Sequence, residues 1–281
     1  MKKQGYAEST IVATGKRLRN LSRHCDLTSP ESVRAFIADK QCSNGFKESL
    51  VEAYDVWCRF QGVQWSKPFY DRYDKLPKIP TEERINILIS NASRRMALIL
   101  SMMRDLGTRP IELTWLKLRD IDLENGIVNV TSAKHCVGRA LKLRAATLDM
   151  LKQYVIRKRL GLNNRLFPVK SASVSEAYRK LRNRLAEKLQ DPTFKTIRLY
   201  DFRHFYATMT YHKTKDLLFV KAQLGHSDLR TTLRYTQLVN LGNEDYVCKA
   251  AKNVSEATQL IEQGFEFVCE VENAKLFRKR K

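Results

Sequence analysis

Ile11, Thr14, Leu18 and Leu21 are three or four positions apart, the spacing that places them on one face of a helix. The capping-box sequence Thr28-Ser-Pro-Glu31 predicts the start of a second helix. A third helix is expected from about residue 46 to Gly62, because glycine is a common stop signal. We therefore predict that residues 1–65 form a small helical domain of their own.

Three prolines, Pro68, Pro77 and Pro80, interrupt this pattern among charged and tyrosine residues. Proline lacks a backbone N–H and clashes with the preceding helical turn, so the stretch cannot form a continuous helix. We place a linker at residues 66–80 and a second domain at residues 81–281. A basic linker of this kind would let two domains close around an elongated partner, although a solvated connector would have the same composition.

The helical pattern returns at Thr81, a predicted cap with two glutamates behind it, and a further helix runs to Gly107. Apolar runs then flank Asn125-Gly126, a turn typical of a β-hairpin, and residues 139–143 are a candidate third strand. Ser173 is the expected cap of another amphipathic helix. Its apolar stripe comprises Val174, Tyr178, Leu181, Leu185 and Leu189. The predicted fold class is mainly α with a small antiparallel β-sheet.

Residues 240–281 form a predicted arm at the end of the second domain. Residues 255–263 have helical spacing, and residues 265–271 alternate as an edge strand does. The turn after this strand is expected at residues 272–273. The basic end, residues 278–281, is predicted to be a loose tail. Docking of the arm on its own domain and on a second copy of the chain explain this pattern equally well.

Charge points to a polyanionic partner. The chain holds 51 Lys and Arg against 30 Asp and Glu, a formal net charge of +21. Such an excess suits nucleic acid, and we expect double-stranded DNA as the partner. An anionic membrane surface is the competing explanation, but the sequence offers no polybasic amphipathic anchor and no lipidation signal. The longest apolar stretch, around residues 96–103, is too short to cross a bilayer.

The cysteines and the first residues indicate an intracellular protein. The six cysteines are scattered, with no histidines at the spacing of metal ligands, so we expect reduced thiols and no metal site. The first residues lack an apolar signal region. A cytoplasmic location is the expectation that follows.

Three segments of the last third carry candidate chemistry: residues 198–204, 224–227 and 231–235. They contain histidines, arginines and two tyrosines, and phosphoryl transfer to a protein needs a nucleophile and fixed positive charge. Arginine can fork two N–H bonds onto a phosphate, so Arg203 is the natural clamp. Arg109 follows a helix stop and precedes Pro110, which places it at a helix start where anions bind readily. On this motif alone, a solvent-facing arginine near a turn is an equally good explanation.

The ordered set of these segments resembles the tyrosine recombinase (phage integrase) family. The residues that carry the resemblance are Arg109, Lys134, Arg203, His226 and Tyr235. It covers nearly the whole chain and is most specific over residues 197–238. The linker and the basic end look most like integrases of archaeal viruses and plasmids. The resemblance implies a helical core-binding domain followed by a catalytic domain.

The family pattern also implies a role for each residue. Tyr235 would be the nucleophile, nine residues after His226, which would bond a non-bridging phosphate oxygen. Arg109 and Arg203 would bind the phosphate. Lys134 would protonate the leaving deoxyribose oxygen, with Lys142 as the alternative. Three other tyrosines compete for the nucleophile's place: Tyr206, Tyr211 and Tyr246.

Two supporting residues and one departure complete the predicted site. Glu112 matches a carboxylate that orients the first arginine, and His204 matches a position that is usually structural. Tyr200 stands where the family usually has a histidine. A phenol can donate a hydrogen bond to phosphate but shuttles protons poorly near neutral pH, so we expect Tyr200 to contact phosphate.

The expected function is site-specific DNA recombination through a 3′-phosphotyrosyl intermediate, as a homo-oligomer on DNA and a tetramer in synapsis. The resemblance implies no cofactor, no metal and no small-molecule substrate. Chromosome-dimer resolution and topoisomerase-like strand transfer would use the same residues. A DNA-binding regulator that has lost catalysis is the alternative of another class.

Overall fold

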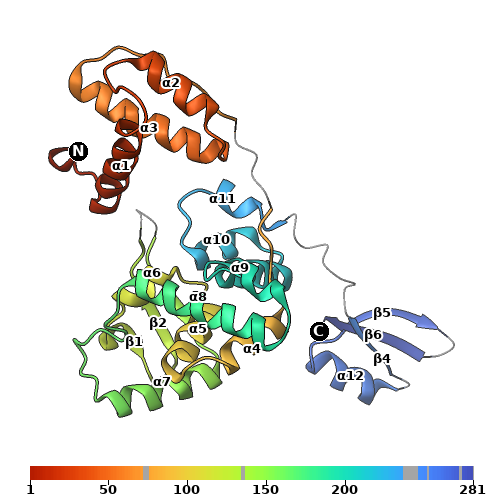
Figure 1. Cartoon of the computed structure of the whole chain (residues 1–281). Coiled ribbons are helices and arrows are strands. Elements are labelled where there is room, and N and C mark those ends of the chain that lie inside the picture. The colour runs from red at the N-terminus through yellow and green to blue at the C-terminus, as the bar shows by residue number, and fades with distance from the viewer. Residues whose placement is uncertain (72–75, 134–136, 237–245, 252, 272–273, 281) are drawn as a thin grey trace. The chain divides into compact units, whose positions relative to one another are not determined.

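The computed structural model describes the chain except at residues 72–75, 134–136, 237–245, 252, 272–273 and 281 (Figure 1). The chain divides into two compact units, Met1–Lys75 and Leu76–Lys281. The boundary falls inside the stretch where the prolines predict a linker. Helices predominate and the strands form two small antiparallel sheets, so the predicted fold class is confirmed. No helix within the described ranges is both long and apolar enough to cross a bilayer.

The first unit packs three helices around one core: α1 (Glu8–Ser22), α2 (Pro30–Asp39) and α3 (Asn44–Gln61), after a short 3-10 turn at Lys2–Gln4. Its buried apolar residues are Leu21, Val33, Ile37, Leu50, Val51, Tyr54 and Cys58. Gly62 ends α3 in the left-handed conformation, at φ 70°. The predicted cap at Thr28 is wrong by one residue: the Ser29 hydroxyl accepts the Ser32 N–H, while Thr28 bonds Asp26 instead.

The segment after α3 remains packed on the first unit. The Trp65 ring meets Tyr54 edge-on, with centroids 4.7 Å apart, and its indole N–H donates to Asp55 Oδ1 at 3.3 Å. Lys67 Nζ lies 2.8 Å from Asp55 Oδ2. The first residues of the predicted linker 66–80 are therefore held by the helical unit through one buried carboxylate.

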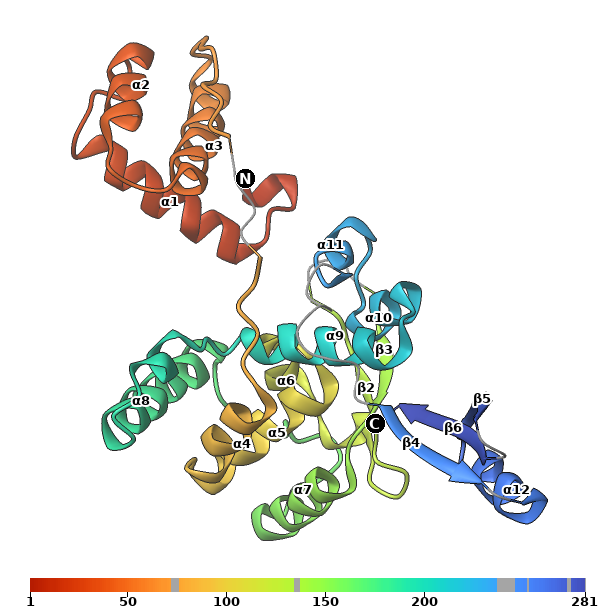
Figure 2. The same cartoon turned by 90° about the vertical axis from the view of Figure 1, so that its right-hand side faces the viewer.

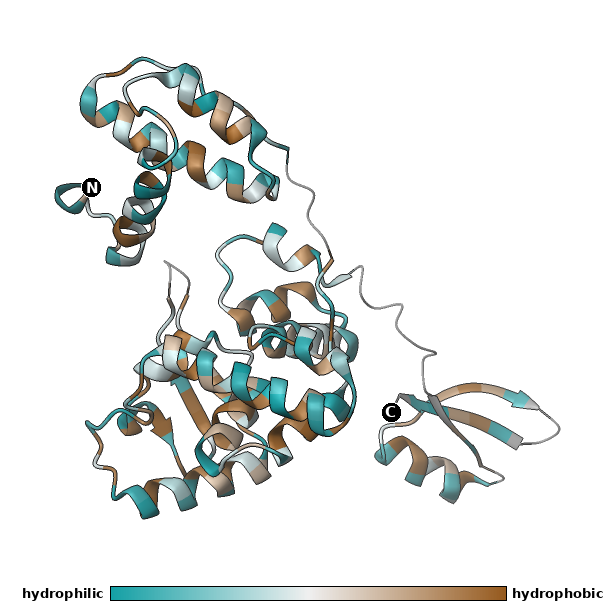
Figure 3. Ribbon diagram, in the orientation of Figure 1, coloured by the Kyte–Doolittle hydropathy of each residue, from teal (hydrophilic) through white to brown (hydrophobic). Residues whose placement is uncertain are grey.

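The second unit is built mainly from helices. Its helices are α4 (Glu82–Ser90), α5 (Arg94–Leu106), α6 (Pro110–Trp115), α7 (Ala145–Lys158), α8 (Ser171–Lys188), α9 (Asp201–Thr214), α10 (Leu217–Leu224) and α11 (Arg230–Leu233), with 3-10 turns at Leu118–Asp120 and Pro192–Thr196. The predicted cap at Thr81 is confirmed, because its hydroxyl accepts the Arg84 N–H. Helix α5 is buried along most of its length and packs against α9 (Figure 2). Outer helices such as α4 and α7 carry both hydrophilic and hydrophobic bands (Figure 3).

The predicted hairpin is present. Strands β1 (Ile121–Asp122), β2 (Ile127–Val130) and β3 (Arg139–Lys142) form an antiparallel sheet in the order β1-β2-β3. Gly126 adopts φ 69° in the turn, as the Asn-Gly sequence predicts. Val128 pairs with Leu141, and both side chains are buried against the core of the second unit.

Helix α8 differs from the prediction at both ends. It begins at Ser171, because the backbone N–H groups of Ser173 and Val174 already bond the carbonyl of Lys170, so Ser173 lies inside the first turn and is not the cap. Leu189 follows the last turn and is 44% exposed, which removes it from the predicted stripe. The other four stripe residues are buried as expected.

The last described residues form a small unit of strands and one helix: β4 (Tyr246–Ala251), α12 (Val254–Glu262), β5 (Glu266–Val271) and β6 (Ala274–Arg280), with sheet order β4-β6-β5. Strand β5 is an edge strand, as its alternation predicts. The predicted loose tail is wrong, because β6 is the central strand and Phe277 is buried beneath α12 with Leu260. Strand β4 was not predicted. The turn predicted at residues 272–273 lies outside the described residues.

Gly107 ends α5 at a point where no other residue fits. Its φ is 56°, and a Cβ there would overlap the ring of Tyr206. We expect Gly107→Ala to lower the free energy of unfolding by roughly 1–3 kcal/mol, through both strain and overpacking. Chemical denaturation measures this. Gly138→Ala is the control, since its added Cβ would meet only Val130 O at 3.5 Å; equal losses in the two variants would contradict the prediction.

Candidate active site

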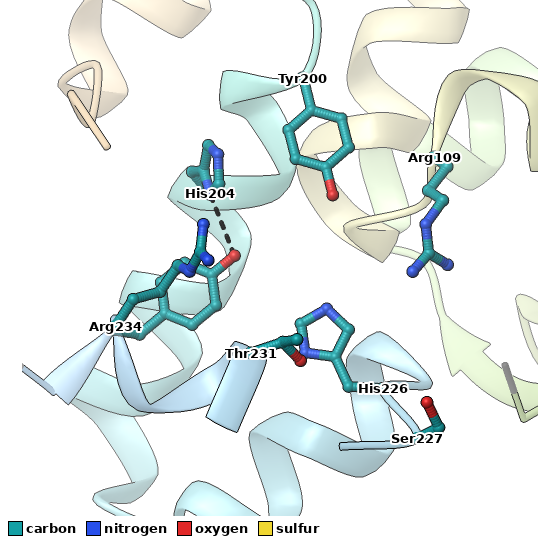
Figure 4. A pocket seen from close by; sticks show the side chains of 8 residues that line it. Arg109, Tyr200, His204, His226, Ser227, Thr231 and Arg234 are labelled. Atoms are coloured by element: carbon teal, nitrogen blue, oxygen red, sulfur yellow. Dashed lines mark hydrogen bonds between the residues drawn. The ribbon is translucent and has the colours of Figure 1, made fainter. Parts of the chain in front are cut away.

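A pocket of about 260 Å³ gathers residues from the start of α6, from α9, and from the segment between the end of α10 and the turn after α11. Its walls are formed by Arg109, Tyr200, His204, His226, Ser227, Thr231, Arg234 and Tyr235 (Figure 4). Five of these were predicted site residues. Three other predicted site residues do not line the described pocket: Glu112 and Arg203 are buried and are not among its lining residues, and Lys134 lies outside the described residues.

Arg109 occupies the predicted helix start. It is the N-cap of α6, with Pro110 in the first turn, and its guanidinium points into the pocket (Figure 4). Its backbone N–H donates to Glu112 Oε2 at 2.9 Å, and its Nη1 donates to Oε1 at 2.7 Å. The Arg109 side chain is only 14% exposed and is fixed by its ion pair with Glu112, so it does not face solvent.

Glu112 joins two arginines to the β2–β3 hairpin. Besides Arg109, it accepts the Ala133 N–H at 3.3 Å and Arg139 Nη2 at 2.9 Å. Burial alone would raise the pKa of Glu112, but hydrogen bonds and charge from Arg139, together with the bonds from Arg109, lower this pKa to about 2. The carboxylate therefore stays ionised and fixes the hairpin one residue before Lys134.

Arg203 lies behind the pocket and is fully buried. Its Nη1 donates to the carbonyl of Gly107 and its Nη2 to that of Leu224, both at 2.7 Å. These carbonyls belong to the ends of α5 and α10, two residues before Arg109 and His226 respectively. Arg203 thus ties together the two segments that present pocket side chains, and it adds a buried positive charge beneath them.

His226 projects from a helix stop, as predicted. Gly225 ends α10 at φ 65°, and the imidazole points into the pocket (Figure 4). Its Nδ1 lies 2.8 Å from the hydroxyl of Thr232, which is fully buried. Burial, followed by the charges of Arg203 and Arg109, lowers the pKa of His226 to about 3. The ring is therefore neutral near neutral pH.

Tyr235 is 2% exposed, and its hydroxyl oxygen lies 3.0 Å from Nδ1 of His204, the contact drawn in Figure 4. Burial raises the pKa of Tyr235 to about 12. Burial, with the charge of Arg234, lowers that of His204 to about 4. Both groups are uncharged at neutral pH. Tyr200 is 41% exposed at the pocket rim and meets the His204 ring edge-on, with centroids 5.1 Å apart.

The competing tyrosines lie elsewhere. The Tyr206 hydroxyl donates to Gln223 Oε1 at 3.0 Å, and Tyr211 packs partly buried against the cluster around Val220. Tyr246 is the first residue of β4. Within the described residues, Tyr200 and Tyr235 are the tyrosines that line the pocket.

Sequence reasoning missed two arginines. Arg139, on β3, has a side chain only 5% exposed and pairs with Glu112, while Arg234 lines the pocket beside Tyr235. The sequence of β3 does not indicate which of its two cations, Arg139 or Lys142, is buried. In the structure Lys142, the predicted alternative to Lys134, is exposed. Among the residues that the structure describes, no group of three His, Cys, Asp or Glu side chains could hold a metal ion.

The chain belongs to the phage integrase family, whose model matches residues 78–240. A probable integrase/recombinase of Methanocaldococcus jannaschii is 34% identical over 158 residues, which cover 53% of this chain and 48% of that protein. The tyrosine recombinase XerA of Saccharolobus solfataricus is 32% identical over 160 residues, which cover 56% of this chain and 52% of that protein. The matches thus span about half the length of these two archaeal relatives. The predicted family resemblance is confirmed.

Two solved structures share the fold. The crystal structure of XerA recombinase has a TM-score of 0.51 at 21% identity and covers 94% of each chain. The Tn1549 transposon integrase, solved in complex with transposon right end DNA, has a TM-score of 0.66 at 14% identity, covering 92% of this chain and 95% of that one.

Proposed function

We propose that this protein is a site-specific DNA recombinase that cleaves and rejoins DNA strands through a covalent link to Tyr235. One observation carries the proposal: a buried tyrosine hydroxyl borders the same pocket as Arg109 and His226. A nucleophile facing fixed cations and hydrogen-bond donors is the arrangement that phosphoryl transfer to a side chain requires. Membership of the phage integrase family supports the same reaction.

In the proposed reaction the Tyr235 oxygen attacks the scissile phosphate, forms a 3′-phosphotyrosyl link and frees a 5′-hydroxyl. Arg109 forks its guanidinium onto the non-bridging oxygens. The Thr232 hydroxyl lies 2.8 Å from His226 Nδ1. In the proposed reaction it donates to that nitrogen, so that His226 carries its proton on Nε2 and donates to phosphate there. Arg203 and Arg139 add positive charge from beneath, and Lys134 protonates the leaving oxygen. The link conserves the phosphodiester's energy, so the reaction needs no nucleotide cofactor.

The substrate we propose is double-stranded DNA, bound by a homo-oligomer that is a tetramer in synapsis. The net charge of +21 supports a polyanionic partner. The Tn1549 transposon integrase, solved in complex with transposon right end DNA, supports DNA as that partner. We further propose that the chain acts for an archaeal virus or plasmid, integrating its genome. Archaeal relatives, one of them a probable integrase, support this origin.

The proposal predicts a covalent protein–DNA adduct. A library of nicked suicide duplexes with random central sequence, incubated with the full chain and captured in SDS, should yield a selected site and a phosphopeptide that contains Tyr235. An adduct on Tyr206, Tyr211 or Tyr246 would overturn the assignment of the nucleophile. Specific binding without any adduct would instead indicate a DNA-binding regulator.

Plasmid assays with the selected site distinguish the uses of this chemistry. Fusion of two plasmids that each carry one site supports integration. Recombination confined to two directly repeated sites on one plasmid indicates dimer resolution. Relaxed circles without recombinants indicate a topoisomerase-like enzyme.

A further inference from the structure

Within the described residues, the hydroxyl of Tyr235 has one hydrogen-bond partner, Nδ1 of His204 at 3.0 Å. His204 lies in the first turn of α9 and is 7% exposed. Its ring stands edge-on to Tyr200 and is tilted against Tyr235, with centroids 5.1 and 5.8 Å away. Two aromatic rings thus hold the imidazole with one nitrogen facing the candidate nucleophile.

A phenol that attacks phosphorus must lose its proton, and few pocket groups can take it. Arg109 and Arg234 have donors only. In the tautomer of the proposed reaction, Thr232 donates to Nδ1 of His226 and Nε2 carries the proton, so neither ring nitrogen accepts another. The hydroxyl of Tyr200 is a much weaker base than an imidazole. His204 therefore combines a basic nitrogen with hydrogen-bond distance to the reacting oxygen.

We propose that His204 is a catalytic residue that accepts the phenolic proton of Tyr235 during strand cleavage. This inference rests on the proposed recombinase function. As the tyrosine oxygen bonds phosphorus, its O–H bond breaks and the proton passes to Nδ1 of His204. The bond from phosphorus to the 5′-oxygen breaks, and that oxygen takes a proton from Lys134. On rejoining, the 5′-hydroxyl gives its proton back to Lys134 as it bonds phosphorus. The bond from phosphorus to the Tyr235 oxygen breaks, and His204 returns its proton to that oxygen.

The chain places this imidazole four residues after Tyr200, the position where the family pattern has a histidine. Residues four apart lie on the same face of a helix. His204 can therefore supply, one turn after position 200, the basic nitrogen that Tyr200 lacks. Tyr200 supplies the ring against which His204 packs. The atypical phenol and the buried imidazole thus divide between them the phosphate contact and the proton transfer.

Burial and nearby charges disfavour the transfer before DNA binds. The rings of Tyr200 and Tyr235 contact His204, and the charges of Arg234, Arg198 and Arg203 act on it. Burial and these arginines lower the pKa of His204 to about 4, while burial raises that of Tyr235 to about 12. A bound phosphate brings negative charge that stabilises the imidazolium, and bonding to phosphorus acidifies the phenol. Proton transfer is thereby coupled to attack.

His204→Asn tests the proposal, because an amide oxygen near the position of Nδ1 still accepts a hydrogen bond but takes no proton near neutral pH. We expect single-turnover adduct formation on the selected nicked duplex to fall by about 10²–10³-fold at pH 7. From pH 6 to 9 the variant's rate should rise by up to tenfold per pH unit, because the phenol must ionise first. The wild-type rate should change much less. Gel-shift affinity and the thermal midpoint report whether the variant binds DNA and folds.

A 5′-bridging phosphorothiolate duplex separates the two proton transfers, because its sulfur leaving group needs no acid. It should rescue Lys134→Ala and leave His204→Asn slow. A wild-type rate in His204→Asn, a defect equal at every pH, or rescue by the thiolate would each overturn the proposal. In those cases the wild type still forms its adduct, so the recombinase function stands. No adduct on wild-type Tyr235 would overturn that function and the role of His204 with it.

Discussion

Tyr235→Phe should abolish covalent DNA cleavage while leaving DNA binding nearly unchanged. The substitution removes one oxygen from a ring that is 2% exposed and packed against Ala207, Val220 and Leu224. The packing survives, and the lost hydrogen bond to His204 costs about 1 kcal/mol of stability. Without its nucleophile the covalent step should slow by at least roughly 10⁴-fold. SDS-resistant complexes on the nicked duplex measure cleavage, and a gel shift measures binding.

Tyr211→Phe is the matched control. It removes the same atom from a partly buried tyrosine that packs against the same cluster and is not among the described residues lining the pocket. We expect wild-type adduct formation from this variant. An adduct that persists in Tyr235→Phe, on Tyr200 for instance, would show that another phenol attacks. Loss of cleavage in Tyr211→Phe would place the site elsewhere.

The two turns that present Arg109 and His226 could be predicted from the sequence because local chemistry decides them. Gly107 and Gly225 stop their helices at φ 56° and 65°, a conformation that glycine adopts at little cost. The hairpin follows in the same way from its Asn-Gly turn. In each case the signal lies within a few residues of its effect.

The burial of the cations could not be predicted, because it depends on contacts between distant segments. Arg203 bonds a carbonyl 96 residues earlier in the chain, and Arg139 pairs with a carboxylate 27 residues away. A motif identified Arg203 but did not reveal that it faces backbone carbonyls. The same holds for strand β6. Its basic sequence is typical of a solvated tail, and only the packing of Phe277 against α12 and the pairing with β4 show that it is a strand.

Glu112→Gln should destabilise the second unit and slow cleavage together. The amide keeps the shape of the carboxylate but loses its charge, and its NH₂ group would face N–H donors of Arg109, Arg139 or Ala133. Leaving buried charges unpaired costs about 3–5 kcal/mol. Cleavage should slow because Arg109 and the hairpin before Lys134 lose their common anchor. Chemical denaturation and single-turnover adduct formation measure the two effects.

Glu176→Gln is the control for charge removal alone. Glu176 pairs with Lys180 at 3.1 Å on the surface of α8, with 56% of its side chain exposed. Exposed pairs one helical turn apart contribute only about 0.3–0.5 kcal/mol. If Glu112→Gln lowered the free energy of unfolding as little as Glu176→Gln does, the anchoring role of Glu112 would be contradicted. Lost stability with unchanged cleavage would limit Glu112 to folding.

The pH dependence of stability provides an independent test of the same carboxylate. The pKa of Glu112 falls from 4.5 to about 2 on folding, so its contribution is fully present above pH 4.5 and is lost as pH falls toward 2. A shift of this size corresponds to about 3 kcal/mol. Protonated Glu112 resembles glutamine, so the stability difference between wild type and Glu112→Gln should shrink through this window. Parallel stability curves down to about pH 2.5 would show that the two arginines do not hold the carboxylate in its ionised form.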